Sequence, residues 1–271
     1  MFTVLGAGGF IGGALVEALR ARGEALRAPT RAEIPHLTGD LGHVVYAAGI
    51  TRDAASQPFE TIEAHVCLLS RLLRAGSFRS FLYLSSAGVY LRARDGDETS
   101  DLPINPTDAG QLYNISKVAG EALCLSIPRD TVRVARLSSV YAADRESPGF
   151  LGQILREAIA TGRLRLRTAP DSARDYVSLA DVVGLLPKIS TEGRARAYNV
   201  ASGSNVSNGE LVHQLGRHIP VTIEVEASAP RIAYPELPIR RIREEFDFQP
   251  RRLLADLGVV VGVYLNRYER R

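Results

Sequence analysis

A tyrosine and a lysine stand four residues apart, at Tyr113 and Lys117, and the chain contains only one other lysine, Lys188. On a helix, residues at this spacing share one face, so the phenol and the ammonium could approach the same small volume. A free phenol titrates near pH ~10, and a neighbouring cation favours its ionised form. The pair therefore indicates proton-transfer chemistry, although the same spacing would also suit two exposed side chains on a solvated helix.

The elements that would position such a pair begin at the N-terminus. Residues 2–5 form a short apolar run suited to a buried parallel strand, and residues 14–20 have a helical pattern. Between them, Gly6, Gly9 and Gly12 follow a Gly-x-x-Gly-x-x-Gly spacing. A strand, a glycine turn and a helix in this order are typical of dinucleotide binding, because glycines allow the turn and the helix N-terminus offers free N–H groups to phosphates.

Together the two motifs resemble the extended short-chain dehydrogenase/reductase family, the NAD-dependent epimerases and dehydratases of nucleotide sugars. Residues 81–90 are similar to the family's fourth strand with a serine at its end, and residues 106–121 to its catalytic helix. The run Arg174-Asp175-Tyr176-Val177, with Asp181, resembles the segment that carries a substrate-binding arginine. Residues 198–200 and 246–250 match further family patterns, so the resemblance covers nearly the whole chain.

The alternation of strand and helix patterns and the resemblance both imply an α/β fold. We expect a Rossmann-like doubly wound parallel sheet with a small C-terminal substrate-binding lobe. Residues 1–142 would form the dinucleotide-binding domain, to which residues 176–200 return, and residues 143–271 would form mainly the lobe. The segment 163–167 looks like part of a hairpin. The stretch 31–43 is short, so the usual helix between the second and third strands would be truncated or absent.

The resemblance implies an NAD(P) cofactor. Asp40 and Leu41 resemble an adenine-contacting turn. Thr30 and Arg31 follow the second strand with no acid beside them, and an arginine suits a 2′-phosphate, so NADP is slightly favoured over NAD unless Arg31 is only a solvated cation. The implied cofactor-binding residues are Gly6, Gly9, Phe10, Ile11, Gly12, Arg31, Asp40, Leu41, Ala47, Ala48, Gly49, Tyr113 and Lys117.

The resemblance also implies the catalytic residues. Ser86 stands where the family places the hydroxyl that holds the substrate oxygen, so Ser86, Tyr113 and Lys117 form the expected catalytic set. Dehydratases of the family carry an acidic pair directly after this serine. Ala87 and Gly88 stand there instead, which disfavours elimination of water.

In addition to Ser86, the resemblance implies two arginines as substrate-binding residues. Arg174 would grip the diphosphate of the substrate, because a guanidinium matches phosphate oxygens with two parallel donors. Arg231, before a proline-rich stretch, would be a second clamp by similarity. His65 stands where the family commonly has an asparagine, and a half-buried structural histidine is favoured over a functional one. Cys67 and Cys124 lack a CxxC partner, so we expect neither a disulfide framework nor a metal site.

Composition limits the class of protein further. The chain is 45% apolar and 23% charged, as is ordinary for a globular protein, and no stretch is apolar enough to span a bilayer. We therefore expect a cytoplasmic protein without a membrane partner. The net charge of +3 does not indicate a nucleic-acid surface.

The function implied is an NAD(P)-dependent oxidoreductase acting on a nucleotide-linked sugar, either as an epimerase or as a keto-sugar reductase. Tyr113 would shuttle the proton, Lys117 would lower the tyrosine pKa and bind the cofactor ribose, and Ser86 would orient the sugar oxygen. The alternatives are a non-catalytic dinucleotide-binding regulator or RNA-binding relative, and a reductase of small carbonyl compounds. By resemblance the protein would be a homodimer, joined through helices near residues 61–75 and 112–126.

Overall fold

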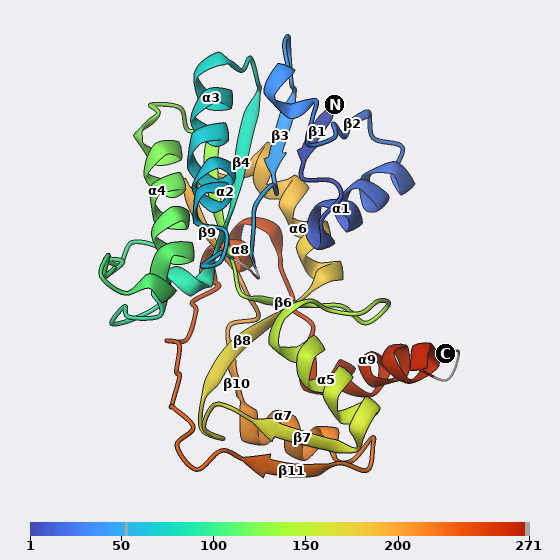
Figure 1. The fold of residues 1–271 in the computed structure, drawn as a ribbon. Coiled ribbons are helices and arrows are strands. Elements are labelled where there is room, and N and C mark those ends of the chain that lie inside the picture. Colours follow the sequence, from blue (N-terminus) through green and yellow to red (C-terminus); the bar gives the residue numbers. More distant parts are fainter. Residues whose placement is uncertain (52–53, 269–271) are drawn as a thin grey trace.

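The computed structural model describes residues 1–51 and 54–268 and is built around a parallel sheet of six strands (Figure 1). The strand order is β2-β1-β3-β4-β5-β9. The order reverses between β1 and β3, because the chain first adds β2 on one side of β1 and then crosses to the other side. The strands are β1 (Phe2–Leu5), β2 (Leu26–Arg27), β3 (His43–Tyr46), β4 (Ser80–Ser86), β5 (Val132–Leu137) and β9 (Ala197–Val200).

Helices cover both faces of this sheet, which confirms the predicted doubly wound fold (Figure 1). α1 (Phe10–Ala21) and α6 (Leu179–Glu192) pack together on one face. α4 (Leu112–Ser126) covers the other face beside a helical segment formed by α2, one π-helical turn and α3. Because both faces are covered, the central strands are buried almost throughout. The bounds of that segment are α2 (Pro58–Ile62), the π turn (Glu63–Cys67) and α3 (Leu68–Ala75).

A second, smaller core lies below the carboxyl edge of the sheet (Figure 1). A three-stranded sheet β10-β8-β6 and a separate pair, β7 with β11, pack there against three helices. The three last residues of the predicted lobe, 269–271, lie outside the described chain. The elements are β6 (Ser139–Tyr141), α5 (Gly149–Thr161), β7 (Arg163–Leu166), β8 (Ala173–Ser178), β10 (Asn205–Ser207), α7 (Asn208–Leu215), β11 (Thr222–Val225) and α9 (Leu253–Tyr268).

The hairpin expected around residues 163–167 is wrong. β7 pairs in parallel with β11, which lies about sixty residues later in the chain. Arg163 is paired with Thr222. Leu164 and Leu166 point into the smaller core while Arg163 and Arg165 are exposed, so the alternation predicted a strand but could not reveal its partner.

The large core contains a further segment of the chain in addition to the predicted return of residues 176–200. Besides α6 and β9, the segment around Leu237 and Ile239 and the helix α8 (Arg240–Phe246) pack on the main sheet. Between β2 and β3 the chain forms only a 3-10 turn, Ile34–His36, in place of the usual helix. Within the described residues, no helix has both the length and the apolar character needed to cross a membrane.

Candidate active site

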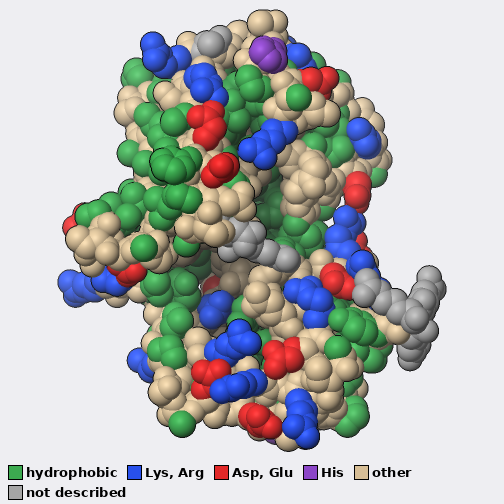
Figure 2. Space-filling model, in the orientation of Figure 1, with side chains coloured by type: hydrophobic (Ala, Val, Ile, Leu, Met, Phe, Trp, Pro, Cys, Tyr) green, Lys and Arg blue, Asp and Glu red, His purple; other side chains and the backbone are tan. Residues whose placement is uncertain are grey.

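The carboxyl ends of β1, β3, β4 and β5 open on a cavity of about 560 Å³. This is the edge of a doubly wound sheet, next to the reversal of strand order, where ligands bind in this architecture. Figure 2 shows the surface hollowed between the sheet and the smaller core. Of the predicted site residues, the cavity is lined by Gly9, Phe10, Ile11, Gly12, Ala47, Gly49, Ser86, Tyr113, Lys117 and Arg174.

The glycine turn has the geometry that a dinucleotide requires. Gly6 has φ +91°, and a Cβ there would lie 2.6 Å from the carbonyl carbon of Ala47. A Cβ at Gly12 would collide with the carbonyl oxygen of Gly6. Gly9 caps α1 without a side-chain hydrogen bond, so the first N–H groups of the helix stay available for phosphate oxygens. The residues present therefore fit the pyrophosphate of NAD(P).

Ser86 and Tyr113 meet at the floor of the cavity. Ser86 is the last residue of β4, its Oγ accepts a hydrogen bond from Gly88 N at 3.0 Å, and its hydroxyl also contacts the Tyr113 phenol. Burial raises the pKa of Tyr113 above its ordinary value, and the hydrogen bond with Ser86 opposes this shift only in part. The phenol is thus protonated at neutral pH and available as a proton donor.

Lys117 lies beneath this pair. Its Nζ donates to the carbonyl oxygen of Leu84 at 2.9 Å and lies 5.0 Å and 5.8 Å from the ring centroids of Tyr83 and Tyr113. Burial lowers the pKa of Lys117 to about 8, while Glu121 acts in the opposite direction. The expectation that this ammonium lowers the Tyr113 pKa is therefore wrong for the ligand-free protein, because desolvation dominates both groups.

His65 connects α4 to the loop after β3. It is fully buried rather than half-buried, within the π-helical turn. Its Nε2 accepts from Ile50 N at 3.2 Å, so the neutral ring carries its proton on Nδ1, which lies 2.7 Å from Ser116 Oγ. Ser116 in turn donates to the carbonyl oxygen of Tyr113 at 2.7 Å. The histidine therefore positions the first turn of α4 without lining the cavity.

This burial predicts a specific acid sensitivity. Burial, together with the charge of Lys117, lowers the pKa of His65 from 6.5 to about 3. The unfolded chain binds the proton more tightly, so stability is lost as pH falls from about 6.5 toward 3, by up to about 4 kcal/mol. His65→Gln should lose less stability over this range than the wild type, as measured by urea unfolding at several pH values. Equal acid sensitivity of the two proteins would contradict the assignment.

A buried polar network joins the ends of β4 and β5 to α4, beside Ser86 and Tyr113. Glu121, one turn after Lys117, accepts from the Arg136 guanidinium at 2.7 Å and from Ser85 Oγ at 2.5 Å. Arg136 also donates to the backbone oxygen of Glu98 at 3.2 Å. Because these groups come from β4, β5, α4 and the loop before it, their bonds tie all four together. Ser85 and Ser86 both line the cavity, but the Ser85 hydroxyl is held by Glu121, which gives Ser85 a positioning role.

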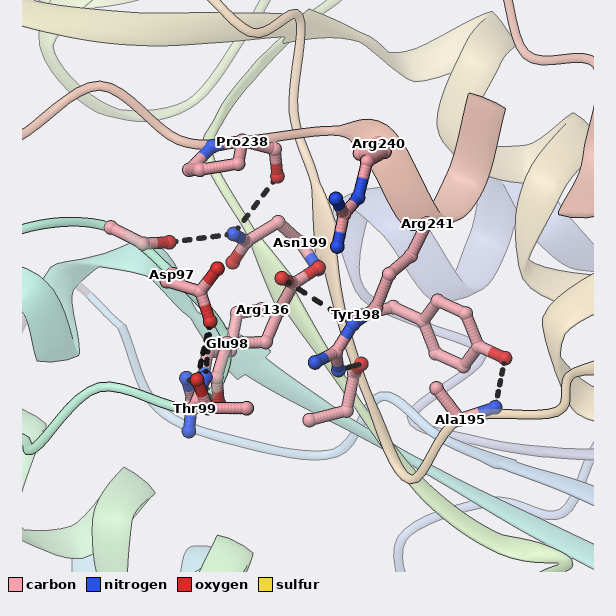
Figure 3. A network of polar contacts seen from close by, with 12 residues as sticks. Asp97, Glu98, Thr99, Arg136, Ala195, Tyr198, Asn199, Pro238, Arg240 and Arg241 are labelled. Atoms are coloured by element: carbon pink, nitrogen blue, oxygen red, sulfur yellow. Dashed lines mark hydrogen bonds and ion pairs between the residues drawn. The ribbon is translucent and has the colours of Figure 1, made fainter. Parts of the chain in front are cut away.

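The far end of the network holds the C-terminal segment on the sheet. The backbone N–H of Asn199 donates to Glu98 Oε1 at 3.2 Å, and its side-chain Nδ2 donates to Pro238 O at 3.1 Å. Arg241, on α8, lies 3.6 Å from Glu98 Oε2. Figure 3 shows these side chains converging from β9, α8 and the loop of Glu98. Leu237, next to Pro238, lines a smaller cavity that adjoins Ser86 and Tyr113, so the network also places part of that wall.

The two predicted phosphate-binding arginines have different places. Arg174, on β8, lines the cavity, and its guanidinium stacks 4.7 Å from the ring centroid of Phe150. Arg231 is exposed, forms an ion pair with Asp171 at 2.8 Å and lines none of the described cavities around Tyr113. The structure therefore brings only Arg174 to the site.

The adenine contact expected from Asp40 and Leu41 is wrong. These residues precede β3 and lie at the amino edge of the sheet, where Leu41 N donates to Ser77 O at 2.8 Å. Leu41 is buried in the core, and Asp40 Oδ1 accepts from Gly42 N. Dinucleotides bind at the opposite, carboxyl edge. The sequence pattern matched, but the missing helix brought it to the start of the next strand.

A separate cavity of about 460 Å³ lies at the carboxyl end of β2. Arg27, the last residue of β2, and His36 line it, whereas Arg31 is exposed in the following turn and does not. An acid that the sequence analysis did not weigh, Glu33, also lines it, but its carboxylate accepts from both the N–H and the hydroxyl of Thr30, at 2.7 Å and 2.8 Å.

Three further residues, none of them among the predicted site residues, border the cavities at this site. Ser138 and Tyr176 line the larger cavity with hydroxyls that have no hydrogen-bond partner in the described part of the chain. Tyr234 borders the side occupied by Arg174. For Ser138, the only signal in the sequence was its place directly after the β5 strand, at the carboxyl edge of the sheet.

The fold and the cavity define a Rossmann-type dinucleotide-binding protein with a serine, a tyrosine and a lysine beside the expected cofactor position. The model of the NAD dependent epimerase/dehydratase family matches residues 2–201, and the chain belongs to this family. Among curated proteins, none matches the sequence.

Solved structures share the whole fold. MoeE5, in complex with UDP-glucose and NAD, is 22% identical with a TM-score of 0.79, and the match covers 100% of this chain and 99% of that one. RMD from Pseudomonas aeruginosa, complexed with NADPH, is 23% identical with a TM-score of 0.80, covering 98% and 99%. The UDP-glucuronic acid 4-epimerase from Bacillus cereus is 18% identical with a TM-score of 0.81, covering 98% and 99%.

Proposed function

We propose that the protein is an NAD(P)-dependent oxidoreductase acting on a nucleotide-linked sugar, as an epimerase or a keto-sugar reductase. One observation carries the proposal: Ser86, Tyr113 and Lys117 converge on a cavity that the glycine turn borders at one end and Arg174 at the other. Such a cavity can hold the cofactor next to the glycine turn, the reacting oxygen next to Ser86 and Tyr113, and a substrate phosphate next to Arg174. Family membership and the nucleotide sugars bound by structural relatives support the same substrate class.

The nicotinamide, when bound, supplies or accepts the hydride. The side chains of this protein manage the oxygen and its proton. Ser86 holds the substrate oxygen, and the protonated Tyr113 phenol donates its proton to that oxygen as a carbonyl is reduced. In the reverse direction the Tyr113 phenolate takes the proton from the sugar hydroxyl. Lys117, fixed to Leu84 O, would place its ammonium against the cofactor ribose. Both candidate reactions share this half-reaction, so the same site serves either.

Elimination of water is not part of the proposal. It needs an additional acid and base, and Ala87 and Gly88 occupy the positions after Ser86. A Cβ at Gly88 would lie 2.8 Å from Asn114 Oδ1, so the site has no room for an acidic side chain there without rearrangement. We therefore keep oxidation, reduction and epimerisation and leave dehydration aside.

Arg174 is proposed as the diphosphate clamp. Arg174→Ala should weaken the binding of UDP by about ten- to a hundredfold, because a charge-assisted hydrogen bond pair is lost. Calorimetric titration with UDP measures this directly. Arg231→Ala is the matched control, since that exposed arginine lies away from the cavity, and it should bind UDP like the wild type. Unchanged UDP affinity in Arg174→Ala would favour a reductase of small carbonyl compounds instead.

NADP is proposed as the preferred cofactor. The support is a pair of cations at the carboxyl end of β2: Arg27, which borders the cavity there, and Arg31 in the next turn. Fluorescence titration should give a lower Kd for NADPH than for NADH. Arg27→Ala should remove most of this difference and Arg31→Ala little of it, because only Arg27 lines the cavity. A tighter Kd for NADH in the wild type would overturn the preference.

A homodimer is proposed through α2, α3 and α4. These helices lie side by side on one face of the sheet, and Phe59 and Leu125 on them are exposed to 84% and 37% (Figure 1). Exposed large apolar side chains on adjacent helices favour association. Sedimentation velocity should show a dimer in the wild type and a monomer in Phe59→Asp; a monomeric wild type would refute the proposal.

Incubation with UDP- and dTDP-linked sugars, while the absorbance of the reduced nicotinamide is followed, tests the function. Net consumption of the reduced cofactor identifies a reductase, and a new epimer without net consumption identifies an epimerase. If the protein binds the dinucleotide and none of the sugars is converted, the non-catalytic regulator or RNA-binding relative becomes the better description.

A further inference from the structure

Two buried hydroxyls on the cavity wall have no internal partner. Ser138 is 8% exposed and Tyr176 is 3% exposed, and neither Ser138 Oγ nor the Tyr176 phenol finds a hydrogen-bond partner among the described residues. Buried polar atoms of this kind are uncommon, because leaving one unpaired costs about 1–3 kcal/mol. Both residues border the cavity, so a bound molecule can supply the missing partner.

The position of Ser138 is fixed by its neighbours. It directly follows β5, and its N–H donates to Val200 O at 3.1 Å. The next residue, Ser139, begins β6 and pairs with Tyr176 on β8, so the two unpartnered hydroxyls come from adjoining parts of one wall. Arg174 stands two residues before Tyr176 on the same strand, on the same face of β8.

Ser138 also stands where two cavities join. A smaller cavity of about 230 Å³ shares part of its wall with the cavity of about 560 Å³ at the carboxyl edge of the sheet. The shared lining therefore runs from the reacting pair to the proposed phosphate clamp, with Ser138 between them. Its six members are Ser86, Tyr113, Leu137, Ser138, Ser139 and Arg174.

We infer that Ser138 and Tyr176 bind hydroxyl groups of the sugar ring while it lies between Tyr113 and Arg174. This rests on the proposed function and adds the residues that would recognise the sugar. The chemistry fits because both side chains are neutral and can both donate and accept, as a sugar hydroxyl can. Burial raises the pKa of Tyr176 to about 12, so its phenol keeps its proton. The charged phosphates have Arg174 for a partner.

The inference predicts an unusual combination for Ser138→Ala in the protein loaded with NADPH. The affinity for UDP-glucose or UDP-glucuronic acid should fall about three- to tenfold, the equivalent of one lost hydrogen bond. The affinity for UDP should not change, because UDP lacks the sugar ring that is linked to the diphosphate in the two UDP-sugars. The melting temperature of the ligand-free variant should stay equal or rise, since an unpaired hydroxyl has been removed.

Ser190→Ala is the matched control. Ser190 is as buried as Ser138, but its Oγ lies 2.9 Å from Ser80 Oγ, so its loss should lower the melting temperature and leave all affinities unchanged. Tyr176→Phe is the second test variant. It keeps the ring and removes only the phenol oxygen, so it should fold and weaken UDP-sugar binding in the same way.

Calorimetric titrations of these variants with UDP, the two UDP-sugars and NADPH decide the matter. If the wild type binds UDP-sugars and both test variants bind them equally well, the inference is overturned while the proposed function stands. If Ser138→Ala weakens NADPH instead, the hydroxyl faces the nicotinamide amide and the sugar assignment is wrong. If the wild type binds neither UDP-sugars nor dTDP-linked sugars, the proposed function itself fails, and the inference falls with it.

Discussion

Tyr113→Phe should reduce turnover of the sugar substrate by about 10²–10⁴-fold, the usual contribution of a positioned proton donor. The phenol contacts Ser86 and carries its proton at neutral pH, and phenylalanine keeps the ring but cannot transfer a proton. UDP affinity should be unchanged, because the diphosphate is proposed to bind Arg174 and not that oxygen. Steady-state kinetics with the reduced cofactor, together with calorimetry for binding, measure both quantities.

Tyr268→Phe is the control for this substitution. Tyr268 ends α9 and lines none of the cavities near the glycine turn, so its loss of a phenol oxygen should leave turnover unchanged. If Tyr113→Phe retained wild-type turnover, another group would supply the proton to the sugar oxygen, and the mechanism proposed above would be wrong.

Lys117→Met should abolish turnover and yet make the protein more stable at neutral pH. Burial lowers the pKa of Lys117 from 10.5 to about 8, so below pH 8 the folded protein holds an ammonium that prefers water. The linkage cost is at most about 3 kcal/mol, and losing the bond to Leu84 O offsets part of the gain, which leaves roughly 1–3 kcal/mol. We attribute the presence of this costly cation to the role proposed for Lys117 at the cofactor ribose.

The pH dependence identifies the cause of this stabilisation. Deprotonation removes the cost, so the difference in unfolding free energy between variant and wild type should shrink as pH rises from 8 to about 10.5. Lys188→Met is the control, because the only other lysine is exposed on α6 and should change stability by no more than about 0.5 kcal/mol. A difference that is independent of pH, or a less stable Lys117→Met, would contradict the assignment.

The sequence predicted the features that depend on local spacing. Gly6, Gly9 and Gly12 act within one turn, and Tyr113 and Lys117 are neighbours on one helix, so their arrangement follows from chain geometry alone. The alternation of strands and helices likewise sufficed for the doubly wound sheet. These features need no knowledge of distant contacts.

Features that depend on distant partners could not be predicted in the same way. Asp40 and Leu41 had the expected residue types, but only the strand pairing reveals that they lie at the amino edge of the sheet. The pKa of Tyr113 depends on burial by surrounding elements, which reverses the direction expected from the nearby lysine. The bond between Glu121 and Arg136 joins α4 to β5, and no sequence pattern pairs those two residues.

The partners of His65 show the same limit. A histidine in place of an asparagine suggested a structural role, and the structure adds which groups it holds, Ile50 N and Ser116 Oγ. Ser116 donates to the carbonyl oxygen of Tyr113, so His65 helps to hold the first turn of α4 in place, although it does not line the cavity. We therefore regard it as a positioning residue rather than a catalytic one.

Transfer of deuterium tests hydride chemistry on a nucleotide-linked sugar most directly. The protein is mixed with reduced cofactor deuterated at the transferable position of the nicotinamide and with UDP- or dTDP-linked keto-sugars, and the sugar is analysed by mass spectrometry after one turnover. Both an epimerase and a keto-sugar reductase should move the label to the sugar, and Tyr113→Phe should suppress the transfer. If the label stays on the nicotinamide with every keto-sugar while the cofactor is bound, the proposed function is contradicted.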